Sequence, residues 1–164
     1  MKTLKLFLPL FALLILFSCK KNSSTPTTAT ATITATVDGT SQTYNVGAAG
    51  HLTSGTGTND LAIVGLSSAG TGGNSLIIDI NTSSPIVAGT YLGSTSQVDF
   101  SYTTSGGAIY QVDNSNSASN ATVVITSITS TTVKGTFSGK LVLIYGSGPA
   151  TSTFTNGAFN LAIK

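Results

Sequence analysis

The strongest constraint on the fold is an alternation of apolar and polar residues with a period of two, clearest from Val133 to Tyr145. An alternation of this kind places apolar side chains on one face of a β-strand and polar side chains on the other. A strand of this length is expected to bend near one of its glycines, Gly135 or Gly139. The residues that share its apolar face are Val133, Gly135, Phe137, Gly139, Leu141, Leu143 and Tyr145.

The same alternation recurs along the chain from Thr32 onward. It predicts strands over 32–37, 40–46, 61–67, 75–80, 97–102, 133–145 and 159–163. Asp38-Gly39 suits a tight hairpin turn between the first two, because both central residues of a type I′ turn need positive φ. Clusters of Gly, Asn, Ser and Pro separate the other runs, and no run shows a helical period. The pattern favours an all-β fold, an antiparallel β-sandwich of about nine or ten strands, with a β-barrel as the alternative.

The first residues of the chain have the three parts of an export signal. Lys2 and Lys5 are followed by the uncharged run from Leu6 to Phe17, and a small residue, Ser18, precedes the only cysteine, Cys19. The run is shorter than the ~20 residues that a membrane-spanning helix needs. We therefore expect residues 1–18 to be removed on export.

The end of this signal, Leu16-Phe17-Ser18-Cys19, resembles the lipobox of bacterial lipoproteins. The resemblance implies that Cys19 carries lipid and becomes the first residue of the mature chain. Residues 19–31 then form a lipidated cysteine and a flexible tether rich in Ser, Thr and Pro, and residues 32–164 form a single all-β domain. A single acyl chain holds a protein only marginally, so stable attachment relies on two or more.

Several short elements of the domain resemble small β-rich envelope lipoproteins of unknown function. They are Thr36-Val37-Asp38-Gly39, Ala88-Gly89-Thr90-Tyr91, Val124-Ile125-Thr126, Lys134 to Gly139 and Thr155 to Phe159. These elements consist of turns and strand cores, so the resemblance implies a β-rich fold and no catalytic residues.

Charge excludes nucleic acid as a partner. The whole chain has a formal charge of +2, but removal of Lys2 and Lys5 leaves equal numbers of Lys and Asp, with no Arg and no Glu. Nucleic-acid binding needs clustered basic residues. The widely spaced Lys134, Lys140 and Lys164 do not supply such a cluster.

Few residues of the chain could form a catalytic or metal-binding site. His51, the only histidine, is expected in a turn as an ordinary loop residue, and an enzyme using it would need Asp and Ser beside it in a cleft. Asp79 and Asp99 could face each other across a sheet, as the paired carboxylates of a glycoside hydrolase would. They lie on the polar side of their strands, however, which favours solvated surface acids. The loop from Asp113 to Ser117 lacks the closing Glu of a calcium loop. We predict no catalytic residue, no metal site and no cofactor.

The leading hypothesis is a non-enzymatic, membrane-anchored lipoprotein of the cell envelope, of binding or structural type, with a protein or glycan partner. We expect the protein to be anchored in the outer membrane, on either its periplasmic or its outer surface. The first alternative is a carbohydrate-binding or adhesion module, which requires exposed tyrosines aligned on one face. The second is an enzyme using His51. The tyrosines are Tyr44, Tyr91, Tyr102, Tyr110 and Tyr145.

Overall fold

The computed structural model describes residues 31–164 except residue 71. The expected signal, Cys19 and most of the tether lie outside these residues. The described elements are β1 (Thr32–Val37), β2 (Thr40–Thr43), β3 (Val46–Gly55), β4 (Thr58–Leu66), β5 (Ser75–Thr82), β6 (Gly89–Leu92), the 3-10 turn η1 (Gly93–Thr95), β7 (Val98–Thr103), β8 (Ile109–Gln111), β9 (Asn120–Ile128), β10 (Thr132–Tyr145) and β11 (Thr151–Ala162).

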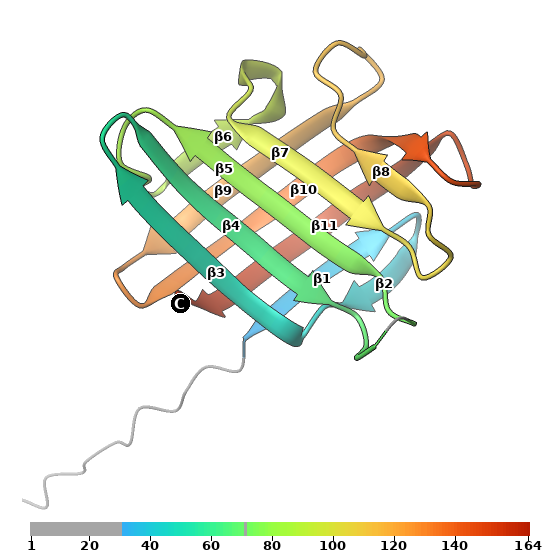
Figure 1. Cartoon of the computed structure of the whole chain (residues 1–164), viewed down its shortest axis with the longest axis horizontal. Coiled ribbons are helices and arrows are strands. Elements are labelled where there is room, and N and C mark those ends of the chain that lie inside the picture. Colours follow the sequence, from blue (N-terminus) through green and yellow to red (C-terminus); the bar gives the residue numbers. More distant parts are fainter. Residues whose placement is uncertain (1–30, 71) are drawn as a thin grey trace, which may run out of the picture.

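The named strands pair antiparallel, which confirms the predicted class. Nine strands of the described chain follow one hydrogen-bonded path, β2-β1-β11-β10-β8-β7-β5-β4-β3, while β9 pairs with β10 and β6 with β9. This single sheet curls strongly into a half-barrel (Figure 1).

The prediction of a two-sheet sandwich is therefore wrong, and the reason lies in β10. Residues 133–140 of this strand pair with β9, whereas residues 142–145 pair with β8 and so continue the sheet. Its pairing register shifts next to Gly135 and Gly139, where we expected a bend. Register shifts of this kind increase the twist of a strand. Period-two alternation shows which residues share a face, but not that one strand has different neighbours at its two ends.

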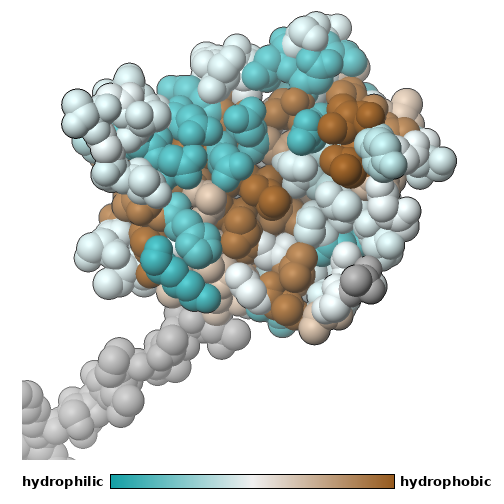
Figure 2. Space-filling model, viewed as in Figure 1, coloured by the Kyte–Doolittle hydropathy of each residue, from teal (hydrophilic) through white to brown (hydrophobic). Residues whose placement is uncertain are grey.

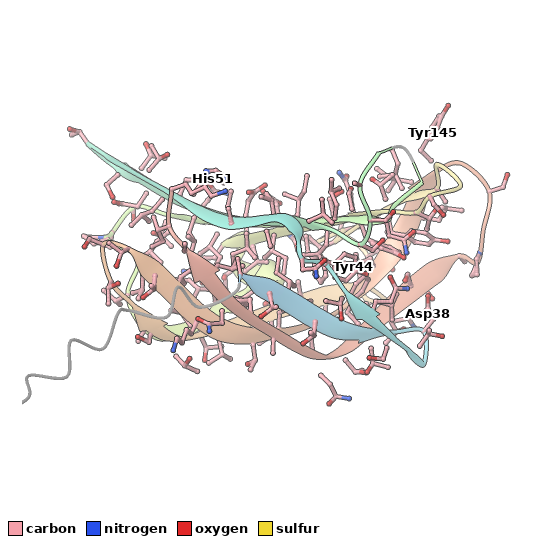
Figure 3. The ribbon with its side chains drawn as sticks, turned by 90° about the horizontal axis from the view of Figure 1, so that it is seen from below. Asp38, Tyr44, His51 and Tyr145 are labelled. Atoms are coloured by element: carbon pink, nitrogen blue, oxygen red, sulfur yellow. The ribbon has the colours of Figure 1, made fainter. Side chains whose placement is uncertain are left out.

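The curled sheet has two walls that face each other (Figures 1 and 3). We call β3, β4, β5 and β7 the front wall, and β1, β11, β10 and β9 the back wall. The core between them contains the Phe100, Phe137 and Phe154 rings, with Phe100 4.8 Å from Phe154 and 5.7 Å from Phe137 between centroids. The largest fully buried side chains are Tyr44, Phe100, Phe154, Ile33, Leu61, Ile63, Leu76, Ile78, Ile80, Ile125, Leu141 and Leu161.

Specific contacts hold the open margins of the half-barrel. At one margin, Gly50 of β3 bridges Ile163, and the Lys164 N–H donates to the Gly50 carbonyl at 2.9 Å. The β1–β2 turn is confirmed, with φ of 48° at Asp38 and 82° at Gly39. The Asp38 carboxylate accepts hydrogen bonds from the Ser152 hydroxyl at 2.8 Å and the Thr153 N–H at 2.7 Å. These bonds tie the first hairpin to β11.

Candidate functional site

His51 does not lie in a turn as expected. It is an exposed residue of β3, opposite Ala62 of β4 (Figure 3). The stretch around it contains glycines and reads locally as a loop, but its pairing with β4 makes it extended. This position on an open strand face differs from the cleft between Asp and Ser that the enzyme alternative requires.

Asp79 and Asp99, which the sequence places on polar strand faces that could oppose each other, are directly paired between β5 and β7. Both are on the outer face of the front wall, the polar side of their strands. Partial burial is the main cause that raises the pKa of Asp79, and the charges of Asp60 and Asp99 raise it further. Like charges directly opposite each other destabilise a sheet. The pair is thus a cost to the fold at neutral pH.

The outer face of the front wall is divided along its strands into two halves. The polar half carries Asp60, Asp79 and Asp99 together with His51. One pairing step further along β4 and β5, Val64 lies opposite Ile77 and Leu66 opposite Ser75. We define the apolar half as Val46, Val64, Leu66, Ile77, Ile109 and Tyr145. In Figure 2, brown side chains run across the centre and right of this face and teal ones gather at the upper left.

The loop after β8 is held by its own side chains. The Asp113 carboxylate accepts from the Ser115 N–H at 2.9 Å and the Ser115 hydroxyl at 2.6 Å. These bonds lower the pKa of Asp113. The carboxylate therefore acts as a turn-forming group. Among the described residues, no three His, Cys, Asp or Glu side chains come together in a way that could hold a metal ion.

The tyrosines do not form a platform. Tyr44, Tyr91, Tyr102 and Tyr110 are buried, whereas Tyr145 is 69% exposed. The Tyr44 hydroxyl donates to Gln42 Oε1 at 2.9 Å, and burial raises the pKa of both Tyr44 and Tyr102. Core packing, the default interpretation of these residues, accounts for all but Tyr145. Stacking of a sugar on two aligned tyrosines is not available in this arrangement.

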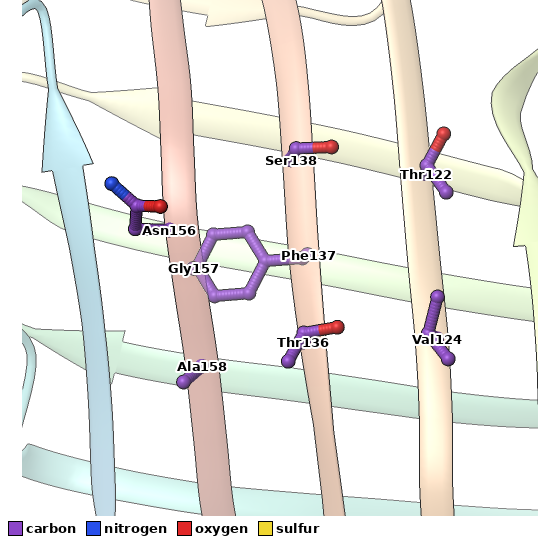
Figure 4. Close-up of a pocket in the computed structure, with 8 residues that line it drawn as sticks. All are labelled: Thr122, Val124, Thr136, Phe137, Ser138, Asn156, Gly157 and Ala158. Carbon is purple, nitrogen blue, oxygen red and sulfur yellow. The ribbon is translucent and has the colours of Figure 1, made fainter.

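A shallow hollow lies on the outer face of the back wall, across β9, β10 and β11 (Figure 4). Its volume is about 340 Å³, within the range of roughly 300–1,000 Å³ typical of small-molecule sites. Four polar side chains lie in its lining: Thr122, Thr136, Ser138 and Asn156. Val124 and Ala158 add apolar surface between them.

The polar groups of the hollow differ from those on its flanks. At the flanks, the Thr126 and Ser119 hydroxyls donate to the carbonyls of Lys134 and Lys140. The four polar side chains of the hollow have no side-chain hydrogen-bond partner within the described part of the chain, so a ligand can use them. Asn156 lies at a register shift of β11 and has a φ of 51°. Such irregularities occur often beside binding sites, where they redirect a side chain.

This hollow was not predicted from the sequence. Its residues are ordinary outward positions of strands that lie far apart in the sequence, and they become neighbours only through the pairing of β9, β10 and β11. The one local signal is Asn156-Gly157 within an otherwise alternating strand, a pair that favours positive φ.

Comparison with protein-family models, curated proteins and solved structures finds no match for this chain. Within residues 31–70 and 72–164, none of the helical structure has the length and apolar character that a membrane crossing would require.

Proposed function

We propose that the protein is a lipid-anchored lipoprotein of the cell envelope that acts by binding and not by catalysis. The export signal, the lipobox ending at Cys19 and the Ser/Thr/Pro-rich tether support the anchor. The observation that carries the binding function is the hollow on the back wall, where the polar side chains of neighbouring strands project outward without internal partners. The outer membrane is the proposed location.

A polyhydroxylated ligand, such as a glycan, is the ligand class best suited to the hollow. Hydroxyl groups of Thr and Ser both donate and accept, as sugar hydroxyls do, and the Asn156 amide adds two donors and an acceptor. Val124 and Ala158 can contact the apolar face of a sugar ring. The proposed glycan site differs from the carbohydrate-binding alternative drawn from the sequence, because hydroxyl and amide groups replace the tyrosine platform that the alternative required.

Isotope-labelled protein with Cys19→Ser, titrated with neutral oligosaccharides and followed by NMR, tests the binding site. We expect shift changes centred on Thr122, Ser138 and Asn156. The double variant Thr122→Val/Ser138→Ala removes two hydroxyls with little change of shape. It should weaken binding by about tenfold, because each lost bond contributes ~0.5–1.5 kcal/mol.

Thr153→Val is the control, since Thr153 is an exposed threonine of the back wall, in β11, that does not line the hollow. Its affinity should equal that of the parent protein. Equal affinity of the double variant and the control would remove the hollow as the binding site. Failure of every oligosaccharide to shift the hollow residues would contradict the glycan proposal.

A further inference from the structure

We infer that the apolar half of the front wall rests on the lipid surface to which Cys19 anchors the protein. This inference rests on the proposed lipid anchor and adds an orientation. Leu66 and Ile77 are 36% and 39% exposed, and Tyr145 is 69% exposed. Val46 lies opposite Leu66, Val64 opposite Ile77 and Ile109 opposite Tyr145 on this face. The polar residues Ser75 and Thr103 lie between Leu66 and Ile109 in the same row.

The apolar half contains a groove that could accept apolar groups. The groove has a volume of about 360 Å³ and is lined by Val46, Val64, Leu66 and Ile77 together with Gly47, Gly65, Ser75 and Leu76. Exposed apolar side chains that gather in one patch mark an interaction surface. Tyr145, at the rim of this half, has the amphipathic ring typical of side chains at a membrane interface.

The position of the chain entry favours lipid over other occupants. The Tyr44 N–H donates to the Ile33 carbonyl at 2.7 Å, and a Cβ added to Gly65 would lie 2.8 Å from the Tyr44 carbonyl oxygen. Both contacts lie on the inner side of Gly65, whose backbone also lines the groove, so Ile33, next to the start of β1 where the expected tether joins the domain, packs behind the groove. The stretch from Lys20 to Thr30 can extend at most about 40 Å, so a lipid on Cys19 would keep the domain, and with it this groove, within reach of the bilayer.

Charge sets which half faces the lipid. Asp60, Asp79 and Asp99 all lie in the polar half, and burial of their charges in the bilayer interface would be costly. The domain should therefore tilt with Leu66, Ile77 and Tyr145 toward the lipid and the carboxylates in water. In this orientation the hollow on the back wall faces away from the membrane.

The chain contains no tryptophan, so single-tryptophan reporters can test the orientation. The lipidated mature protein, which begins at Cys19, is inserted into vesicles of phosphatidylethanolamine and phosphatidylglycerol, with and without bromine on the acyl chains. Leu66→Trp and, as a second reporter, Ile77→Trp should be quenched several-fold more strongly than Thr53→Trp. Thr53 is an exposed residue of β3 beside Asp60, in the polar half of the same face.

Equal, weak quenching of all three reporters would overturn the orientation. A blue-shifted emission of Leu66→Trp that depends on protein concentration and not on bromine would also overturn it, and would indicate a second copy on this face. Incorporation of labelled palmitate at Cys19 is measured on the same preparations. Retained label with unquenched reporters contradicts the orientation alone, whereas loss of the label contradicts the anchor itself.

Discussion

At the residue scale, the clearest conflict in the molecule is the pairing of Asp79 with Asp99. Asp60 adds a third negative charge on the same outer face, and burial together with these charges raises the pKa of Asp79. A raised pKa means that the folded protein holds the proton more tightly than the unfolded chain does. The stability associated with this proton is therefore fully present below the ordinary pKa of Asp, and it is lost as pH rises through the higher pKa of the folded state.

Asp79→Asn should accordingly stabilise the protein at pH 7, by about 0.5 kcal/mol as for other like-charge pairs across strands. The gain should disappear near pH 3, where the parent residue is protonated. Urea unfolding at the two pH values measures both effects. Asp113→Asn is the control, because hydrogen bonds from Ser115 lower the pKa of Asp113, and it should not stabilise at pH 7. A gain for Asp79→Asn that is as large at pH 3 would contradict the electrostatic cause.

At the scale of elements, β3 is an edge strand whose free side is closed by contacts with the end of the chain. It pairs along its length with β4 alone, and the other side is joined to the end of the chain by the Gly50–Ile163 bridge and the bond from the Lys164 N–H to the Gly50 carbonyl. Edge strands with few partners open more readily than central ones. The last residue of the chain thus contributes to closure of the half-barrel.

Deletion of Lys164 should therefore speed amide hydrogen exchange in β3, because it removes the bond to Gly50. The β1–β2 hairpin, whose turn is bonded to Ser152 and Thr153 at the other end of β11, should exchange as in the parent protein and serves as the internal control. Hydrogen exchange followed by mass spectrometry on peptides from the two regions provides the comparison. Unchanged exchange in β3, or an equal increase in both regions, would contradict the proposed role of the C-terminus.

Strand faces could be predicted from the sequence, but strand pairing could not. The alternation in 133–145 and the turn at Asp38-Gly39 identify local structure correctly, because both depend on neighbouring residues. The curl of the sheet depends on β10 changing partners from β9 to β8, which is a property of the whole fold. From the sequence, the facing of Asp79 and Asp99 was only a possibility suggested by their polar strand faces, and the hollow formed by three strands could not be predicted.

At the scale of the whole molecule, the two outer faces differ in chemistry and are proposed to differ in role. The front wall carries the three aspartates and the apolar half, whereas the back wall carries the hydroxyl-lined hollow. Lys134 and Lys140 also lie on the back wall, so the two walls carry charges of opposite sign. If Cys19 carries a lipid anchor, we propose that the front wall faces the bilayer and the back wall faces a ligand.

Labelling of cells with palmitate tests the central claim most directly, since the orientation of the domain depends on a lipid at Cys19. The parent protein and the Cys19→Ala variant are expressed with labelled palmitate and recovered from membranes. We predict that the parent carries the label and sediments with membranes, while Cys19→Ala carries none and keeps its signal. Equal label on both proteins, or an unlabelled parent, would contradict the account.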